Sequence, residues 1–434
     1  MITYSKALEE RITVDVFVAG GGPAGVAAAI AAAKQGKKVF IAEAGGCFGG
    51  SSTQNMVPEF MNFGDGEHFM AGGIGQEVIT RLFGEAAHDR RGYFIKAEKV
   101  KRLYDDMIQE NGIDFLFFAK VVDVIKENDR VTHAVVSGKG GLYAVSAEMF
   151  IDCTGDGSLS VLSGADYLFA ENGAVSPTTL CSVWAGADFD KRENIYHDGA
   201  NFMKAYNDGV FSQYDTVLPG IKPVDPERGY GVGNVGHVFK VDDTSDRSVS
   251  DAMIFARNNL KEYEFYYNNY VPGFKNVALE HTANVLGVRE SRRIMCDTYM
   301  TVDKFDADFA YPDEIGRYSY PVDIHPETPD KEGMQGFTQN TKISLDYGQN
   351  YSIPYGALAV KGVDNVLVAG KCISADRSMQ ASVRVIPGCF ITGQAAGVAA
   401  AVCCDNKTTT HNADIKAIQQ KLIAMGAYLP NPIK

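Results

Sequence analysis

Short apolar runs separated by glycine-rich breaks characterise the start of the chain. The run "VDVFVA" at 14–19 contains β-branched residues and predicts a buried strand. The segment "GGGPAG" at 20–25 interrupts this run, and "VAAAIAAAKQGKK" then predicts a helix that ends near Gly36. A second apolar run, "VFIAEA" at 39–44, predicts another strand. This order predicts a βαβ unit.

Later segments return to the same kind of pattern. Residues 98–110, "EKVKRLYDDMIQE", have the spacing of an amphipathic helix. The segment 113–157 predicts a series of strands, the last of which ends in a Gly-Asp-Gly turn. From residue 347 onward, the run "NVLVAG" predicts a strand, and a helix rich in glycine and alanine is expected after Pro387.

The pattern changes between these parts. From 166 to 346, aromatic residues, prolines and polar loops become frequent, as in "EYEFYYNNYVPGF". We therefore expect an α/β protein. Residues 1–165 and 347–434 would form a discontinuous Rossmann-like nucleotide-binding domain. Residues 166–346 would form an inserted α+β substrate domain.

Composition and charge narrow the classes of partner. The 434 residues are 45% hydrophobic and 22% charged, which is compatible with a sizeable core. The net charge of -13 argues against nonspecific binding to nucleic acid or to anionic membranes. The scattered histidines show no metal-ligand spacing, so no metal is expected.

Neither a membrane span nor a secretory signal is expected from the sequence. Two uncharged stretches, 16–33 and 386–404, are long enough to span a membrane, but both are rich in glycine and alanine, and we expect buried helices there. The eight cysteines form no CxxC pair, and residues 1–18 lack the pattern of a signal peptide. We expect a cytoplasmic protein that binds no membrane.

The first glycine cluster, Gly20 to Gly25, fits the pattern GxGxxG of dinucleotide-binding turns. The first glycine permits the tight turn, the second lets the backbone approach a pyrophosphate, and the third lets helix and strand pack closely. The helix that follows would present free N–H groups to the phosphates. Glu43 ends the second strand, where a carboxylate can hold a ribose diol. Together these features predict dinucleotide binding.

A second match to the same pattern, Gly231 to Gly236, has a different context. The preceding segment "DPERGY" does not predict a strand, and the following "HVFKVDD" alternates like a strand rather than a helix. We interpret this match as a loop or hairpin, so the chain has one predicted dinucleotide site.

Several further segments are informative together with the N-terminal βαβ unit and "GGCFGGSST": "FIDCTGDGSLSVLSGADY", "NVGHVFKVD", "LGVRESRRI", "YSIPYGAL", and "NVLVAGKCISA" with "SVRVIPGCFITGQAAGVAAA". With these segments the chain resembles the FAD-dependent oxidoreductase family of glutathione-reductase-like flavoproteins. These segments occur in family order over nearly the whole chain. The resemblance implies FAD bound noncovalently as cofactor, with adenine at the βαβ unit and the isoalloxazine ring at the domain interface.

The resemblance also implies a set of residues that hold FAD. The expected set is Gly20, Gly22, Pro23, Ala24, Gly25, Glu43, Ala44, Gly49, Gly50, Ser51, Ser52, Thr53, Val121, Thr154, Gly155, Asp156, Gly370, Lys371 and Gly393. Two positions depart from the family pattern. Lys371 stands where the family often has arginine, and Asp376-Arg377 stand where smaller or neutral residues are usual.

Three residues are candidates for catalysis: Arg384, Arg289 and His237. Arg384 stands just before the glycine-rich helix, and Arg289 belongs to "HTANVLGVRESRRI", which also contains Arg292 and Arg293. Related flavoenzymes that act on unsaturated acids use such side chains to anchor carboxylates. Each could instead be structural, since Glu290 adjoins Arg289 and could pair with an arginine.

The expected function is FAD-dependent oxidation or reduction of a small-molecule substrate, with NAD(P)H or a redox partner protein as a candidate electron source. Two alternatives stay open. A flavin monooxygenase would share "GDGSLS", although the arginine that usually follows this motif is missing. A flavin-binding electron-transfer subunit would need a partner that holds the next cofactor. Cys47 has no second cysteine five residues later, where Ser52 stands, so a dithiol mechanism is not expected.

Overall fold

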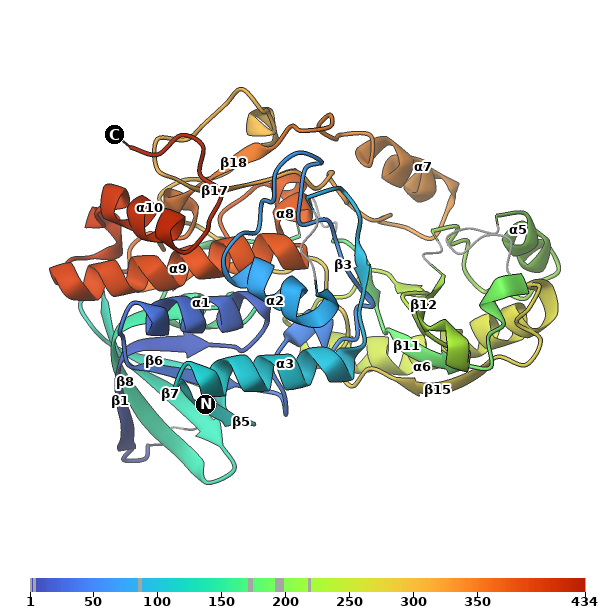
Figure 1. The fold of residues 1–434 in the computed structure, drawn as a ribbon. Helices are drawn as coiled ribbons and strands as arrows, with labels where there is room; N and C mark the ends of the chain where they lie inside the picture. Colours follow the sequence, from blue (N-terminus) through green and yellow to red (C-terminus); the bar gives the residue numbers. More distant parts are fainter. Residues whose placement is uncertain are drawn as a thin grey trace.

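A seven-stranded sheet forms the centre of the molecule. The computed structural model describes residues 2, 5–84, 88–170, 175–191, 199–217 and 220–433. Within them the strand order is β5-β2-β1-β8-β7-β6, and β19 also pairs with β8 (Figure 1). The strands are β1 (Glu9–Ala19), β2 (Val39–Glu43), β5 (Asp114–Phe117), β6 (Lys120–Glu127), β7 (Arg130–Gly138), β8 (Gly141–Asp152) and β19 (Val366–Val368).

Strand β8 joins two kinds of sheet. Its carboxyl half runs parallel to both β1 and β19, while its amino half pairs antiparallel with β7, which in turn pairs antiparallel with β6. Strands β2 and β5 extend the parallel part on the other side of β1. Because neighbouring parallel strands end at the same edge, β1, β2, β8 and β19 bring their carboxyl ends together.

Two glycine- and alanine-rich helices pack closely against each other, as their composition allows. These are α1 (Pro23–Lys34) and α9 (Ile386–Asn406), both almost fully buried. A Cβ atom on Gly393 would lie 2.2 Å from the carbonyl oxygen of Ala24, and one on Gly397 would lie 2.1 Å from that of Ala28. Side chains larger than hydrogen at these two positions would push the helices apart.

Helix α9 is long and apolar enough to cross a membrane, but its hydrophobic stretch is wholly buried inside the protein. The other stretch of this kind, 16–33, is divided between β1 and α1. Further helices are α2 (Ile74–Phe83), α3 (Ala97–Glu110), α4 (Ser158–Leu162), α8 (Arg377–Val383) and α10 (Ile415–Ala424). Of these, α2, α8 and α10 pack against α9, α3 packs against α1 and α2, and α4 packs against β6 and β8 (Figure 1).

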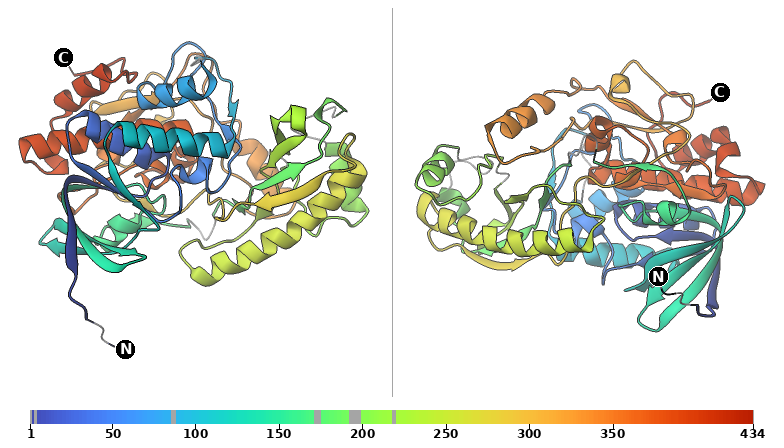
Figure 2. Two further views of the ribbon diagram at one scale, coloured as in Figure 1. Left: turned by 60° about the horizontal axis from the view of Figure 1, so that its bottom comes forward. Right: turned by 180° about the vertical axis from the view of Figure 1, so that it is seen from behind.

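A second sheet lies at the end of the molecule away from α10, and both views of Figure 2 separate it from the central sheet. Its order is β12-β13-β11-β15. Trp184, Tyr263, Tyr266 and Tyr267 are buried in its own aromatic core. Its elements are β11 (Ser182–Ala185), β12 (Ile221–Asp225), β13 (Tyr230–Gly233), β15 (Ala278–Thr282), α5 (Gly199–Asn207) and α6 (Asp246–Tyr270).

The second GxGxxG match begins within this sheet. Gly231 and Gly233 belong to β13, which forms an antiparallel pair with β12, and no helix follows directly. The hairpin interpretation of this match is therefore confirmed.

The middle of the chain also contributes to the main core. Ile294, Met300, Ile315 and Tyr318 pack in the core of the central sheet rather than in the aromatic core. Short strand pairs and α7 complete the fold. They are β3 (Glu59–Phe60) with β4 (Tyr93–Phe94), β9 (Tyr167–Leu168) with β16 (Arg293–Ile294), β10 (Thr178–Thr179) with β14 (His237–Val238), β17 (Glu314–Tyr318) with β18 (Tyr351–Pro354), and α7 (Lys331–Asn340).

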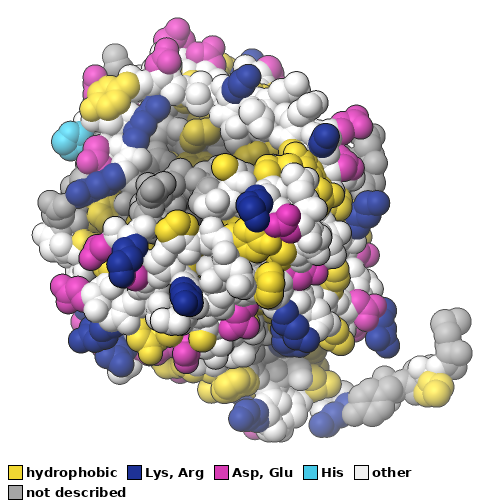
Figure 3. Space-filling model, turned by 90° about the vertical axis from the view of Figure 1, so that its right-hand side faces the viewer, with side chains coloured by type: hydrophobic (Ala, Val, Ile, Leu, Met, Phe, Trp, Pro, Cys, Tyr) yellow, Lys and Arg dark blue, Asp and Glu magenta, His cyan; other side chains and the backbone are white. Residues whose placement is uncertain are grey.

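Charges of both signs are distributed over the surface. On the face drawn in Figure 3, lysine and arginine side chains alternate with aspartate and glutamate, and hydrophobic side chains lie between them. This distribution accompanies the net charge of -13. On this face of the molecule, the charges do not gather into a patch of one sign.

Candidate functional site

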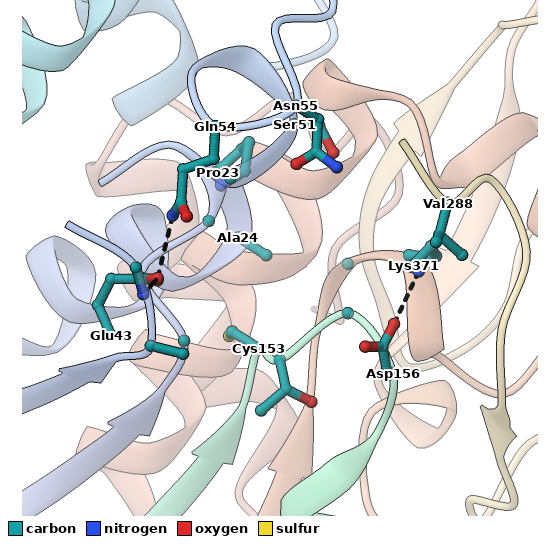
Figure 4. Close-up of a pocket in the computed structure, with 18 of the residues that line it drawn as sticks. Pro23, Ala24, Glu43, Ser51, Gln54, Asn55, Cys153, Asp156, Val288 and Lys371 are labelled. Atoms are coloured by element: carbon teal, nitrogen blue, oxygen red, sulfur yellow. Dashed lines mark hydrogen bonds and ion pairs between the residues drawn. The ribbon is translucent and has the colours of Figure 1, made fainter. Parts of the chain in front are cut away.

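A cavity of about 500 Å³ lies at the carboxyl ends of β1, β2, β8 and β19. We call it the first cavity. Its walls come from parts of the chain that are distant in sequence: the glycine turn after β1, the loop after β2, residues 119–121, the turn after β8, and the segments around residues 285–289 and 369–389 (Figure 4). A crevice beyond the carboxyl ends of parallel strands is where ligands bind in open α/β sheets.

The glycine turn has the three properties that its pattern predicts. Gly20 has a φ of 90°, and a Cβ there would lie 2.6 Å from the carbonyl oxygen of Cys153. A Cβ on Gly25 would lie 1.9 Å from the carbonyl oxygen of Gly20, so only glycine permits this approach of helix and strand. A Cβ on Gly22 would meet nothing within 4 Å. Because Gly22 lines the first cavity, its missing side chain leaves room there.

Glu43 is buried at the end of β2 and fixes the turn. Its carboxylate accepts hydrogen bonds from the backbone N–H of Gly21 at 2.6 Å and of Gly45 at 2.5 Å. The side-chain amide of Gln54 donates a third, at 3.0 Å (Figure 4). Glu43 also lines the first cavity, as expected of a ribose-binding acid, while Gln54 is a lining residue that the sequence analysis missed.

The loop after β2 is attached to the glycine turn. The N–H of Gly49 donates to the carbonyl oxygen of Gly21 at 2.8 Å. The hydroxyls of Ser52 and Thr53 donate back to the carbonyl oxygens of Gly49 and Phe48, at 2.7 and 2.6 Å. Cys47 lies in the same loop, and burial raises the pKa of its thiol. The loop is therefore held by its own polar side chains.

A buried carboxylate organises the turn after β8. Asp152 accepts hydrogen bonds from the backbone N–H and hydroxyl of Thr154, at 3.1 and 2.7 Å, and from those of Ser160, both at 2.8 Å. This arrangement presents Thr154, Gly155 and Asp156 to the first cavity. Asp152 was not among the predicted site residues, although it stands directly before the turn.

Lys371 donates to the Asp156 carboxylate at 2.9 Å, and both residues line the first cavity (Figure 4). Burial favours the neutral amine, but Asp156 and the nearby Asp243 outweigh it and raise the pKa of Lys371. Burial raises the pKa of Asp243. The lysine is therefore a cation on the wall of this cavity.

Two arginines, Arg289 and Arg384, also line the first cavity. Arg289 donates to the carbonyl oxygen of Pro177 and the hydroxyl of Thr179, both at 2.8 Å, and to Asn234 at 3.1 Å. Burial, and next repulsion from Arg384, lowers the pKa of Arg289 to about 10, so it stays charged at neutral pH. Arg384 donates to the backbone oxygen of Asp323 at 3.0 Å, and its carboxylate lies 3.5 Å away.

Most of the predicted cofactor residues line the first cavity, together with Arg289 and Arg384. They are Gly20, Gly22, Pro23, Ala24, Glu43, Ala44, Gly50, Ser51, Val121, Thr154, Gly155, Asp156, Gly370 and Lys371. Five others lie behind its surface, where they pack or hold the loop: Gly25, Gly49, Ser52, Thr53 and Gly393.

Several lining residues were missed by the sequence analysis. They include Gln54, Asn55, Cys153, Val285, Leu286, Val288, Ile386 and Cys389. Gln54 and Asn55 directly follow the predicted strip, and 285–288 directly precede Arg289, so adjacency was the available signal. Burial raises the pKa of the Cys389 thiol to about 12. This cysteine is therefore neutral at physiological pH.

His237 lies away from the first cavity, in a buried polar chain. Its Nδ1 is 3.1 Å from Asp215 Oδ1, and its Nε2 is 2.9 Å from Nδ1 of His325. His325 Nε2 lies 3.5 Å from a carboxylate oxygen of Asp323, the residue that Arg384 contacts. His325 and Asp323 line a second cavity, of about 400 Å³. Arg289 contacts Asn234, Arg384 contacts Asp323, and His237 reaches Asp323 through His325. All three catalytic candidates therefore lie near the boundary between the two cavities.

Comparisons with known proteins bear on the family. The sequence pattern of the family described as FAD dependent oxidoreductase matches residues 15–422. A thiamine thiazole synthase of Pyrococcus horikoshii is 25% identical over 170 residues, which cover 36% of this chain and 63% of that relative, so the match spans less than two thirds of its length.

Two solved structures match this chain along most of its length. A geranylgeranyl bacteriochlorophyll reductase-like protein of Thermoplasma acidophilum shares 15% identity, over 95% of this chain and 83% of that one, with a TM-score of 0.47. A p-nitrophenol 4-monooxygenase of Pseudomonas putida shares 12% identity, over 95% and 84%, with a TM-score of 0.46. Because the family pattern spans nearly the whole sequence, the chain belongs to the FAD dependent oxidoreductase family and is an enzyme that uses FAD.

Proposed function

We propose that this enzyme oxidises or reduces a small molecule next to FAD held in the first cavity. The observation that carries the proposal is the convergence of segments distant in sequence on one cavity, which the glycine turn, Arg289 and Arg384 all line. Adenosine would lie near Glu43 and Val121, the pyrophosphate across Gly22, and the isoalloxazine ring near Arg289.

The residues present fit such a cofactor. Gly22 leaves open space where any other residue would place a Cβ, and this space faces the first N–H groups of α1. Those groups and the partial positive charge of the helix end suit a pyrophosphate. Glu43 accepts three hydrogen bonds, and a carboxylate has about four acceptor positions, so it can still receive one from a ribose hydroxyl.

The positive charges of Arg289 and Arg384 suit the redox-active end of the cofactor. When bound, FAD supplies a group that takes up or gives up an electron pair. Arg289 keeps its positive charge without a carboxylate within 4.0 Å among the described residues, and Arg384 lies beside it. Helix α9 begins at Ile386 on the same wall and adds the partial positive charge of its N-terminus. These groups stabilise negative charge at this wall.

The finer fold class and the division of the chain belong to this proposal. The antiparallel strands β6 and β7 beside a parallel sheet support a glutathione-reductase-like arrangement. A separate aromatic core under the second sheet supports an inserted substrate domain within residues 166–346. NAD(P)H or a redox protein as electron source, and a cytoplasmic location without membrane or nucleic-acid partners, remain expectations from the sequence.

The test begins with the purified protein reconstituted with FAD and passed through a desalting column. We expect the flavin absorbance bands to remain with the protein. Anaerobic titration with a panel of metabolites should then identify one that reduces the bound flavin, or one that reoxidises it after chemical reduction. Loss of all flavin on desalting would overturn the proposal. Oxygen consumption coupled to NAD(P)H oxidation would instead support a monooxygenase.

A further inference from the structure

The second cavity lies beside the first. It has a volume of about 400 Å³, within the range of about 300–1,000 Å³ typical of small-molecule sites. Two hydrogen bonds link residues of the two cavities: Arg384 to Asp323 at 3.0 Å, and Arg289 to Asn234 at 3.1 Å. A molecule in the second cavity would therefore lie against the wall where we place the isoalloxazine ring.

Much of the second cavity is apolar. Met334 and Phe337 project into it from one face of α7, since residues three apart lie on the same side of a helix. Its other apolar lining residues come from the segments around β3 and before β12: Val57, Pro58, Met61 and Val217. These walls suit a carbon skeleton more than a heavily charged molecule.

The charged groups of the second cavity are already matched within the protein. Lys222 lies 3.5 Å from Glu59, and Asp323 lies 3.5 Å from Arg384. Burial, and next the charge of Arg289, lowers the pKa of His325 to about 3, so this histidine is neutral. The described lining residues thus carry one positive and two negative charges, which disfavours an anionic ligand.

The lining also contains a tyrosine hydroxyl without such a partner. The hydroxyl of Tyr320, just beyond β17, makes no hydrogen bond with the described residues, while its backbone oxygen accepts one from Ser382. By contrast, the hydroxyl of Thr338 donates to the backbone oxygen of Met334 at 3.1 Å. Burial, and next the Asp323 carboxylate, raise the pKa of Tyr320. Its hydroxyl therefore keeps its proton and can donate a hydrogen bond.

We propose that the second cavity binds an uncharged alcohol or carbonyl compound with an apolar carbon skeleton, and that the Tyr320 hydroxyl holds its oxygen atom. The inference rests on the proposed function, because it assigns the substrate class of the same enzyme. His237 is a positioning residue here: it lies between Asp215 and His325, and it fixes the imidazole that borders the cavity.

The test uses the FAD-loaded protein and three bicyclic probes of matched size: 2-decalone, 2-decalol and decalin-2-carboxylate. Isothermal titration calorimetry should show binding of the ketone and the alcohol, with the carboxylate at least about tenfold weaker. Tyr320→Phe should weaken ketone and alcohol binding about three- to tenfold, the effect of one neutral hydrogen bond. Met334→Trp should abolish it by filling the cavity.

Controls separate the two proposals. Tyr230→Phe removes the hydroxyl of an exposed tyrosine in β13 and should leave probe affinity unchanged. Retained flavin absorbance in every variant shows that the first cavity is intact, so loss of FAD from the wild-type protein counts against the proposed function alone. With FAD retained, carboxylate binding as tight as ketone binding would overturn the substrate class. Absence of probe binding, or unchanged binding in both cavity variants, would overturn the site.

Discussion

The two cavities differ in what lines them. The first is bordered largely by backbone and small residues such as Gly22, Ala24 and Gly155, placed by turns at the ends of parallel strands. The second is bordered by large side chains such as Met334, Phe337 and Tyr320, brought from loops and from α7. A backbone-lined site depends on close approach of main-chain atoms, whereas a side-chain-lined site depends on the identity of individual residues.

This difference predicts that glycine substitutions in the first cavity have the largest effects. Gly25→Ala places a Cβ 1.9 Å from the carbonyl oxygen of Gly20, and neither backbone segment can move without separating α1 from β1. We expect the free energy of unfolding to fall by about 3 kcal/mol or more, as in severe overpacking, with loss of FAD. Chemical denaturation with and without added FAD measures both. Stability within about 1 kcal/mol of the wild type would contradict the packing role.

Gly22→Ala is the matched variant in the same turn. Its Cβ meets no protein atom within 4 Å, so the fold should keep its stability in the absence of FAD. The new methyl group projects into the first cavity, and we expect FAD to bind about ten- to a hundredfold more weakly, a loss of about 1.4–2.7 kcal/mol. Fluorescence titration of the apoprotein with FAD provides the measurement. Equal FAD affinity in Gly22→Ala and in the wild type would mean that the pyrophosphate does not lie at Gly22.

The same contrast explains what the sequence could and could not predict. Gly20, Gly22 and Glu43 were predictable, because tight turns and strand-end acids leave local patterns within about 25 residues of chain. Ser52 and Thr53 were expected along the cofactor, but they bond to their own loop, since a hydroxyl in a turn readily finds a nearby carbonyl oxygen. Tyr320 could not be predicted, because only the fold brings β17 beside β3 and α7.

The buried histidine of the second cavity makes a pH prediction. The pKa of His325 is about 3 in the folded protein, against an ordinary value of 6.5. As the pH falls below 6.5 the unfolded chain takes up the proton first, so the folded state loses stability, and the loss continues down to about pH 3. Between pH 7 and pH 5 we expect a loss of about 2 kcal/mol from this group.

The variant His325→Gln should remove this contribution and flatten the pH dependence of the free energy of unfolding, measured by urea denaturation of the FAD-saturated protein at pH 5, 6 and 7. His281→Gln changes an exposed histidine of β15 and should keep the wild-type slope. A slope that is unchanged in the first variant would show that folding does not lower the pKa of His325.

A smaller, purely electrostatic effect on the midpoint potential of bound FAD is expected at Arg289. Arg289→Gln removes a positive charge beside the proposed isoalloxazine site while a side-chain amide can still donate to Thr179. We expect the two-electron midpoint potential of bound FAD to fall by about 30 mV, the equivalent of about 1.4 kcal/mol. Arg247→Gln, at a guanidinium that is 84% exposed on α6, serves as the control and should leave the potential unchanged. An unchanged potential in both variants would move the isoalloxazine ring away from Arg289.

The smallest effect is expected at Cys47, in the loop that joins the glycine turn. Burial raises the pKa of this thiol, its sulfur lies 3.8 Å from the Thr53 hydroxyl, and it does not line the first cavity. Cys47→Ser should therefore change FAD affinity and the free energy of unfolding by no more than about 0.5 kcal/mol. Alkylation by iodoacetamide should be slow at pH 7, because only the thiolate reacts. Fast alkylation accompanied by loss of flavin reduction would instead make Cys47 a redox-active residue. The loop would then hold a reactive thiol beside the glycines that the sequence predicts along the cofactor.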